Sequence, residues 1–126
     1  MATESANVND LSFPASTDHS AHQYCPMTVN SSALIEVSAA AKSIDGILQD
    51  KPAALNRAGT IRRSGISKAI VGSTNSVSAG ALLEVDANAN GLMTHNAGII
   101  VAKALTGGAV GNTITVLLLP SNGLYA

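Results

Sequence analysis

The chain has 126 residues and a formal net charge of −1, and it contains 46% hydrophobic, 12% charged and 2% aromatic residues. This length fits one compact domain with an appendage and excludes a multidomain enzyme. Such a low and balanced charge excludes the basic surface expected of a nucleic-acid-binding protein. With so few aromatic residues, aliphatic strands must supply the core.

Residues 1–32 differ in composition from the rest of the chain. Ser, Asn, Thr and Asp dominate there, and the apolar residues Val8, Leu11 and Phe13 stand isolated between them. Such a segment buries too little apolar surface to offset the entropy lost on ordering. We therefore expect an extended N-terminal arm over residues 1–32, with Phe13 as its best anchor on a partner, and a β-rich domain over residues 33–126.

Short runs of Ile, Val and Leu follow, separated by clusters of Gly, Asn, Ser and Asp, a pattern typical of strands joined by tight turns. We expect strands at residues 34–37, 44–48, 60–66, 69–71, 82–85, 92–94, 99–102 and 113–119. Helix is limited to a turn near residues 53–57. The predicted fold is mainly β, a small barrel or sandwich of short strands.

A weak internal repeat is visible in the strand-rich part. The segment Ala33–Val37 resembles Ala81–Val85, and Gly46–Leu48 resembles Gly98–Ile100 in the same order. One interpretation is two copies of a multistranded unit that close on each other, because one copy alone has too little apolar face. The alternative is chance similarity among strands rich in Ala, Val and Leu.

The single cysteine, Cys25, excludes an intrachain disulfide and fits a reducing compartment. No apolar run approaches the roughly 18 residues of a membrane span, and no signal peptide is recognisable, so we expect a soluble, unprocessed protein with no membrane partner.

His19, His22 and Cys25 are spaced by three residues and are residue types that bind transition metals. They lack a fourth nearby ligand, so we interpret them as polar residues of the arm and expect no metal or cofactor. Cys25 with His22 or His95 as base is an enzymatic alternative, and Glu36 with Glu84 is a glycosidase-type alternative. We favour neither and assign no catalytic residue.

Basic residues gather at Arg57, Arg62, Arg63 and Lys68. No aromatic platform accompanies them, as single-stranded nucleic acid would require. This cluster indicates a strand edge that faces solvent or another protein.

Several segments, taken in order, resemble the capsid cement or head decoration proteins of tailed bacteriophages. They share Gly-bounded strands, an Ala-rich loop and a final strand that ends in Leu-Leu-Leu-Pro, and they lie at residues 45–54, 59–61, 65–71, 77–83, 98–105 and 114–120. The resemblance covers about residues 33–120, and the N-terminal segment has no match.

The resemblance implies a β-tulip-like domain, often a homotrimer, that binds the outside of a capsid and stabilises contacts between major capsid protein subunits without catalysis. It places the protein on the outer capsid surface of a virion, after synthesis in the bacterial cytoplasm. Together with the expected arm, it gives these candidate capsid contacts: Val8, Leu11, Phe13, Tyr24, Arg62 and Arg63. The alternative is a host-attachment or carbohydrate-binding module on the same surface, for which Phe13, Tyr24 and Tyr125 supply few aromatic platforms.

Overall fold

The computed structural model describes residues 8–119, which form nine β-strands and no helix. The strands are β1 (Asn9–Pro14), β2 (Pro26–Val29), β3 (Ile35–Val37), β4 (Gly46–Leu48), β5 (Ala58–Ile70), β6 (Leu82–Val85), β7 (Leu92–Thr94), β8 (Ala102–Ala104) and β9 (Thr113–Leu118). The predicted mainly β fold is confirmed. In the described part of the chain no helix is long and apolar enough to cross a membrane.

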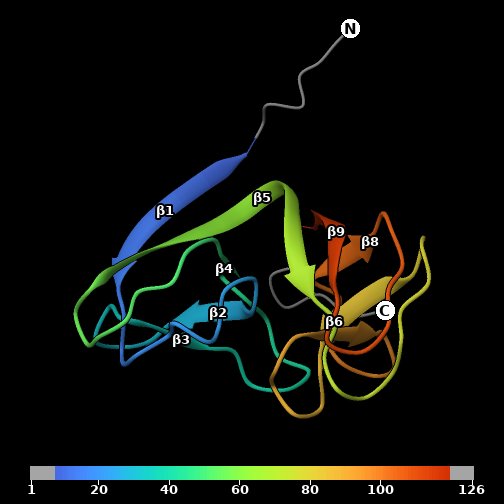
Figure 1. Ribbon diagram of the computed structural model, residues 1–126, viewed down its shortest axis with the longest axis horizontal. Helices are drawn as coiled ribbons and strands as arrows, with labels where there is room; N and C mark the ends of the chain where they lie inside the picture. Colours follow the sequence, from blue (N-terminus) through green and yellow to red (C-terminus); the bar gives the residue numbers. More distant parts are fainter. Residues whose placement is uncertain (1–7, 120–126) are drawn as a thin grey trace, which may run out of the picture.

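All nine strands belong to one antiparallel sheet, which follows the order β3-β2-β4-β5-β9-β8-β6-β7, with β1 paired to β5. β5 is 13 residues long and is shared by two groups of strands. Its first part pairs with β1 and β4, and its second part pairs with β9. Figure 1 shows β5 running between the two groups, with β1–β4 on one side and β6–β9 on the other.

β5 changes direction near its middle, which places the two groups side by side. The β1–β5 register shifts between Asn9 and Asp10, so that Asn9 lies opposite Ser64 and Asp10 opposite Arg62. Gly65 follows with φ of 90°, a backbone conformation that L side chains disfavour. A bulge of this kind bends a strand, and the bend separates a first half, residues 9–62, from a second half, residues 65–118.

The two halves repeat the same strand pairing. β1 corresponds to the second part of β5, and the first part of β5 corresponds to β9. Between them, β2 corresponds to β6, β3 to β7 and β4 to β8. Met27 lies opposite Val37 on β2 and β3. The equivalent pair on β6 and β7 is Leu83 and Thr94, which lie 56 and 57 residues further along the chain.

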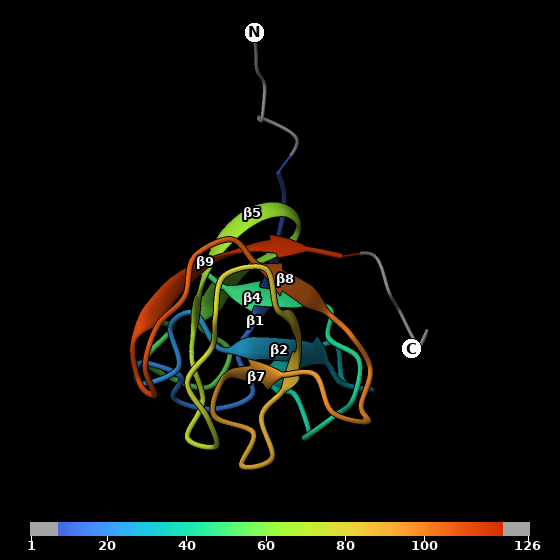
Figure 2. The ribbon, with the colours of Figure 1, turned by 90° about the vertical axis from the view of Figure 1, so that its right-hand side faces the viewer.

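Hydrogen bonds outside the strands repeat as well. The amide of Tyr24 donates to the carbonyl of Leu48 (2.7 Å), and 56 residues later the amide of Gly80 donates to the carbonyl of Ala104 (2.7 Å). A single parallel bridge joins Ala15 to β3, and another joins Val71 to β7, so each group of strands curls back on itself. Figure 2 views the second half end-on and shows its strands curving around an interior. The internal repeat is therefore present in the fold.

The register of the repeat differs from the one that the sequence indicated. Sequence similarity matched residues 33–37 with residues 81–85, whereas the structure matches β3 with β7 and β2 with β6. This first match was displaced by one strand, whereas the match of Gly46–Leu48 with Gly98–Ile100 was displaced by four residues, because the structural counterpart of β4 is β8. Strands of similar composition resemble one another whatever their place in a sheet, and only the pairing partners identify the equivalent ones.

Each half has its own core. Met27, Ile35, Leu48 and Ile61 lie in the core of the first half, and Leu83, Leu92 and Val116 lie in that of the second. Ile47, on β4 of the first half, joins the core of the second half and is 0% exposed. The two halves are therefore packed against each other. Burial of one such side chain stabilises the fold by about 1.5–3 kcal/mol.

The structure corrects the expected arm for residues 9–32. β1 and β2 are integral strands, and Ala15, Cys25 and Met27 are fully or almost fully buried. The segment was misread because its few apolar residues are isolated in the sequence, although Leu11, Phe13 and Met27 pack in or against the core of the first half. Residues 1–7 lie outside the described part of the chain, and the expected boundary at residues 32–33 falls within the turn between β2 and β3.

Candidate functional site at the junction of the two halves

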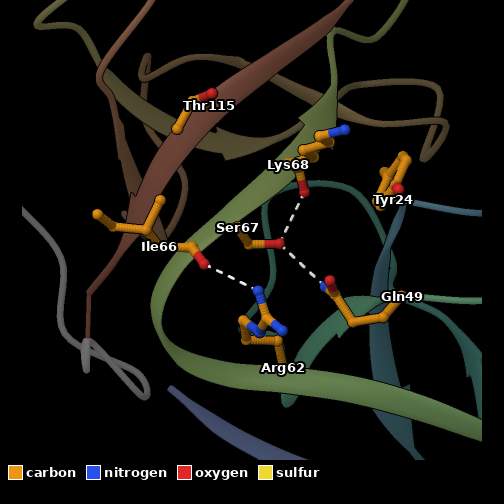
Figure 3. Close-up of a pocket in the computed structure, with 7 residues that line it drawn as sticks. All are labelled: Tyr24, Gln49, Arg62, Ile66, Ser67, Lys68 and Thr115. Carbon is orange, nitrogen blue, oxygen red and sulfur yellow. Dashed lines mark hydrogen bonds between the residues drawn. The ribbon is translucent and has the colours of Figure 1, made fainter. Parts of the chain in front are cut away.

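An open pocket of about 300 Å³ lies where the two halves meet. Its lining comes from both halves and consists of Tyr24, Gln49, Arg62, Ile66, Ser67, Lys68 and Thr115. Four of these residues belong to β5, on either side of its bend, and Figure 3 shows how they surround the hollow.

Gln49 and Ser67 connect the two halves across the floor of the pocket. Gln49 Nε2 donates to Ser67 Oγ (2.9 Å) and to the carbonyl of Ile47 (2.9 Å). Ser67 Oγ donates in turn to the carbonyl of Lys68 (2.8 Å), as the dashed lines in Figure 3 show. The serine hydroxyl is thereby committed to a structural bond, and no histidine lines the pocket to activate it.

Arg62 is held in place from two sides. Its Nε and Nη2 donate to the two carboxylate oxygens of Asp10 (2.8 and 3.1 Å), and its Nη1 donates to the carbonyl of Ile66 (3.1 Å). The hydrogen bond from Arg62 lowers the pKa of the Asp10 carboxyl, and the reciprocal bond raises the pKa of Arg62. The fork geometry fixes the guanidinium at the pocket wall.

Tyr24 and Lys68 form the opposite wall. Tyr24 has φ of 68°, and its carbonyl accepts a bond from the amide of Ile70 (3.1 Å), which ties the first half to the second. The ammonium of Lys68 lies 5.9 Å from the centroid of the Tyr24 ring. A cation beside an aromatic face, with an amide nearby, can bind a polar or acidic group of a partner.

The predicted contact residues are divided between the surface, the pocket and the core. Val8 is exposed, as is Arg63. Leu11 and Phe13 are half-buried and pack against the core of the first half, so they are not free anchors on an arm. Tyr24 and Arg62 line the pocket.

His19, His22 and Cys25 belong to the body of the first half. His19 is 2% exposed; its Nε2 lies 3.1 Å from the carbonyl of Ile35 and its Nδ1 lies 2.9 Å from His22 Nδ1. Because a carbonyl only accepts, His19 donates through Nε2, and His22 donates to its Nδ1. Burial raises the pKa of the Cys25 thiol. Among residues 8–119 no group of three His, Cys, Asp or Glu residues could hold a metal ion.

The two glutamates considered as a pair have separate surroundings. Glu36 is exposed on β3 and accepts a bond from Asn30 Nδ2 (3.1 Å). Glu84 is buried on β6, and its Oε1 contacts His95 Nδ1 and accepts the amides of Asn96 and Gly98 at 2.7–3.1 Å. Glu84 therefore fixes the loop after β7, and neither glutamate lines the pocket.

Comparison with solved structures identifies a chain of the same fold. The structure is similar to that of the head fiber gp8.5 N base of bacteriophage phi29, with a TM-score of 0.66. The match covers 90% of this chain and 96% of that chain, at 12% sequence identity. No protein-family model matches the sequence, and no curated protein matches it.

Proposed function

We propose that this chain is a structural protein of a bacteriophage virion that binds the outer surface of the capsid through the major capsid protein. The observation that carries the proposal is the fold shared with a phage head fiber base over nearly the full length of both chains. The resemblance of residues 33–120 to capsid cement proteins supports it independently, because it rests on sequence motifs.

The finer parts of the proposal are that the chain acts by binding and not by catalysis, assembles as a homotrimer, and cements neighbouring capsid subunits. Interactions made simultaneously by several copies increase the overall affinity without new kinds of contact. Several copies bound together therefore dissociate from a capsid more slowly than one copy alone.

The location is tested by immunogold labelling of intact particles of the parent phage and by cryo-electron microscopy of their heads. We expect label on the outside of the head and density of this fold on the capsid surface. Particles that lack the chain, or that carry it only on the tail or inside the head, would overturn the proposal.

Cementing is tested separately with heads produced without the chain. These heads should release DNA at a lower temperature than complete heads, and adding the purified protein should restore the difference. Binding to the heads without a change in release temperature would leave the location standing and refute the cementing role.

The pocket favours the alternative, a carbohydrate-binding module, because Tyr24 and Gln49 supply an aromatic face and an amide. A glycan array with the wild-type protein and a Tyr24→Ala variant distinguishes the two. Binding that is lost in the variant would support glycan recognition, and the absence of any binding would count against it.

A further inference from the structure

The contact between the two halves is made by one face of the first half. Pro26 and Ile47 are cross-strand neighbours on β2 and β4, and both are buried. Side chains alternate between the two faces of a strand. Met27 and Leu48 therefore point into the core of the first half, whereas Ile47 packs into the core of the second half.

No residue among 8–119 covers the equivalent face of the second half. Leu82 and Lys103, 56 residues after Pro26 and Ile47, form the same cross-strand pair on β6 and β8. Leu82 is 40% exposed, Lys103 is exposed, and Leu105, the counterpart of Gln49, is 41% exposed. We call the surface formed by Leu82, Ile100, Lys103 and Leu105 the tail face.

The second half shows which surface binds such a face within the chain. There Ser67, Ile70 and Val85 receive the first half: Ser67 Oγ accepts from Gln49, the Ile70 amide donates to Tyr24, and the Val85 carbonyl accepts the amide of Ala41. Their counterparts in the first half are Leu11, Pro14 and Val29, which we call the head face. Ser67 is 2% and Val85 0% exposed, whereas all three head-face residues are only half-buried.

One residue on each face differs from the internal junction in the same way. Inside the chain, Gln49 and Ser67 form a polar pair across the junction. At the equivalent positions Leu105 is 41% exposed on the tail face, and Leu11 packs in part against the core of its own half and is only half-buried at the head face, so the polar pair is replaced by two leucines. Two leucines at these positions suit a contact between the two faces, because each then meets an apolar side chain.

We infer that the tail face of one copy binds the head face of a second copy, in the geometry that joins the two halves within the chain. Such a contact is head-to-tail and uses two different surfaces, so it closes a ring or extends a filament. It lacks one hydrogen bond of the internal junction, because Pro14 has no N–H where Ile70 has one. Lys103 also replaces an isoleucine, so this association is weaker than the internal one.

The inference rests on the proposed function in one respect, the homo-oligomer. Its test uses the purified chain alone, so its failure would leave the capsid location untouched, and absence from the capsid would leave self-association untouched.

Sedimentation equilibrium of the full chain measures self-association directly. Leu82→Glu and Leu105→Glu should each raise the dissociation constant about tenfold or more, which corresponds to about 1.4 kcal/mol. Lys103→Ile, which installs the residue found at the internal junction, should tighten association. These residues are exposed, so unfolding midpoints should stay near that of the wild type.

The matched control is Val110→Glu. Val110 and its counterpart Leu55 are 47% and 59% exposed. The internal junction covers one face of each half, and it leaves this position exposed in both. Neither face therefore uses this position, and the control should associate like the wild type. A monomeric wild type at all concentrations, an equal effect of Val110→Glu, or association that resists both leucine substitutions would overturn the inference.

A cross-linking experiment tests the register. A Leu11→Cys, Leu105→Cys double variant should give covalent oligomers with a short bismaleimide, because the equivalent side chains Gln49 and Ser67 touch in the internal junction. A Leu11→Cys, Val110→Cys variant is the control, and native Cys25 is 3% exposed. Cross-linking as efficient in the control, or absent from both, would contradict head-to-tail contact.

Discussion

The first and second halves of this protein have the same strand pairing. At most equivalent positions of the paired strands, however, their side chains differ. Ile47 and Lys103 occupy equivalent positions opposite Arg62 and Leu117, yet one is buried and the other is exposed. The pairing pattern depends on backbone hydrogen bonds, which any residue other than proline can make. The side chain at each position reports whether a neighbour covers it.

The largest effect is expected from exchanging the residues at this pair of positions. Ile47→Lys places an ammonium in the core of the second half, where burial disfavours the charged form, and should lower the free energy of unfolding by at least about 3 kcal/mol. Lys103→Ile should not lower it. Chemical denaturation of both variants measures the difference. Equal stability of the two would show that the junction is not packed.

The turn before the last strand of each half gives a second test. Asn56 and Gly111 occupy equivalent positions, with φ of 66° and 84°. Asparagine tolerates this region and valine does not, so Gly111→Asn should be nearly neutral while Gly111→Val costs about 1–2 kcal/mol. Thermal unfolding of both variants checks this. A valine variant as stable as the wild type would break the proposed equivalence.

A cross-strand pair distinguishes the halves by charge. Asp10 and Arg62 form an ion pair where Ile66 and Leu117 form an apolar pair in the second half. The pKa of Asp10 is lowered in the fold, so its contribution is present above the usual carboxyl range and is lost as the pH falls through the folded pKa. Asp10→Asn should cost up to about 1 kcal/mol at neutral pH, and less in high salt. Urea unfolding at two salt concentrations measures it, and a salt-independent loss would point to packing.

The smallest effect concerns the histidines, which only the first half has at these positions. Partial burial, and then the charge of His19, lower the pKa of His22. The unfolded chain therefore binds the proton more readily, and stability should fall as the pH drops below about 6.5. His22→Ser, which installs the residue of the second half, should flatten this pH dependence in thermal unfolding. An unchanged profile would assign it to other groups.

The candidate pocket was only partly predictable. Tyr24 and Arg62 stood out as an aromatic residue and a cation in a chain poor in both, and Lys68 was part of the basic cluster. Gln49 and Thr115 carried no signal, because ordinary polar residues on different strands show no spacing that links them. The bend of β5 brings these positions together.

Short aliphatic runs between Gly, Asn and Asp turns favour paired strands, and they sufficed to predict the class of the fold and the approximate place of seven of the nine strands in residues 8–119. The sequence also contained the repeat, although the predicted register was displaced by one strand at residues 33–37 and by four residues at residues 46–48. β1 and β2 were not predicted, because polar residues dominate their segment and the few apolar residues that reach the core form no continuous run.

Contacts between distant strands establish which strands are equivalent and which of their faces are covered. A strand exposes two faces, and its sequence records their alternation but not the identity of the surface that meets each one. Ile47 is buried because the second half packs on it, and Leu82 is exposed because no described residue covers it. That difference arises from contacts between segments far apart in the chain, which local composition does not encode.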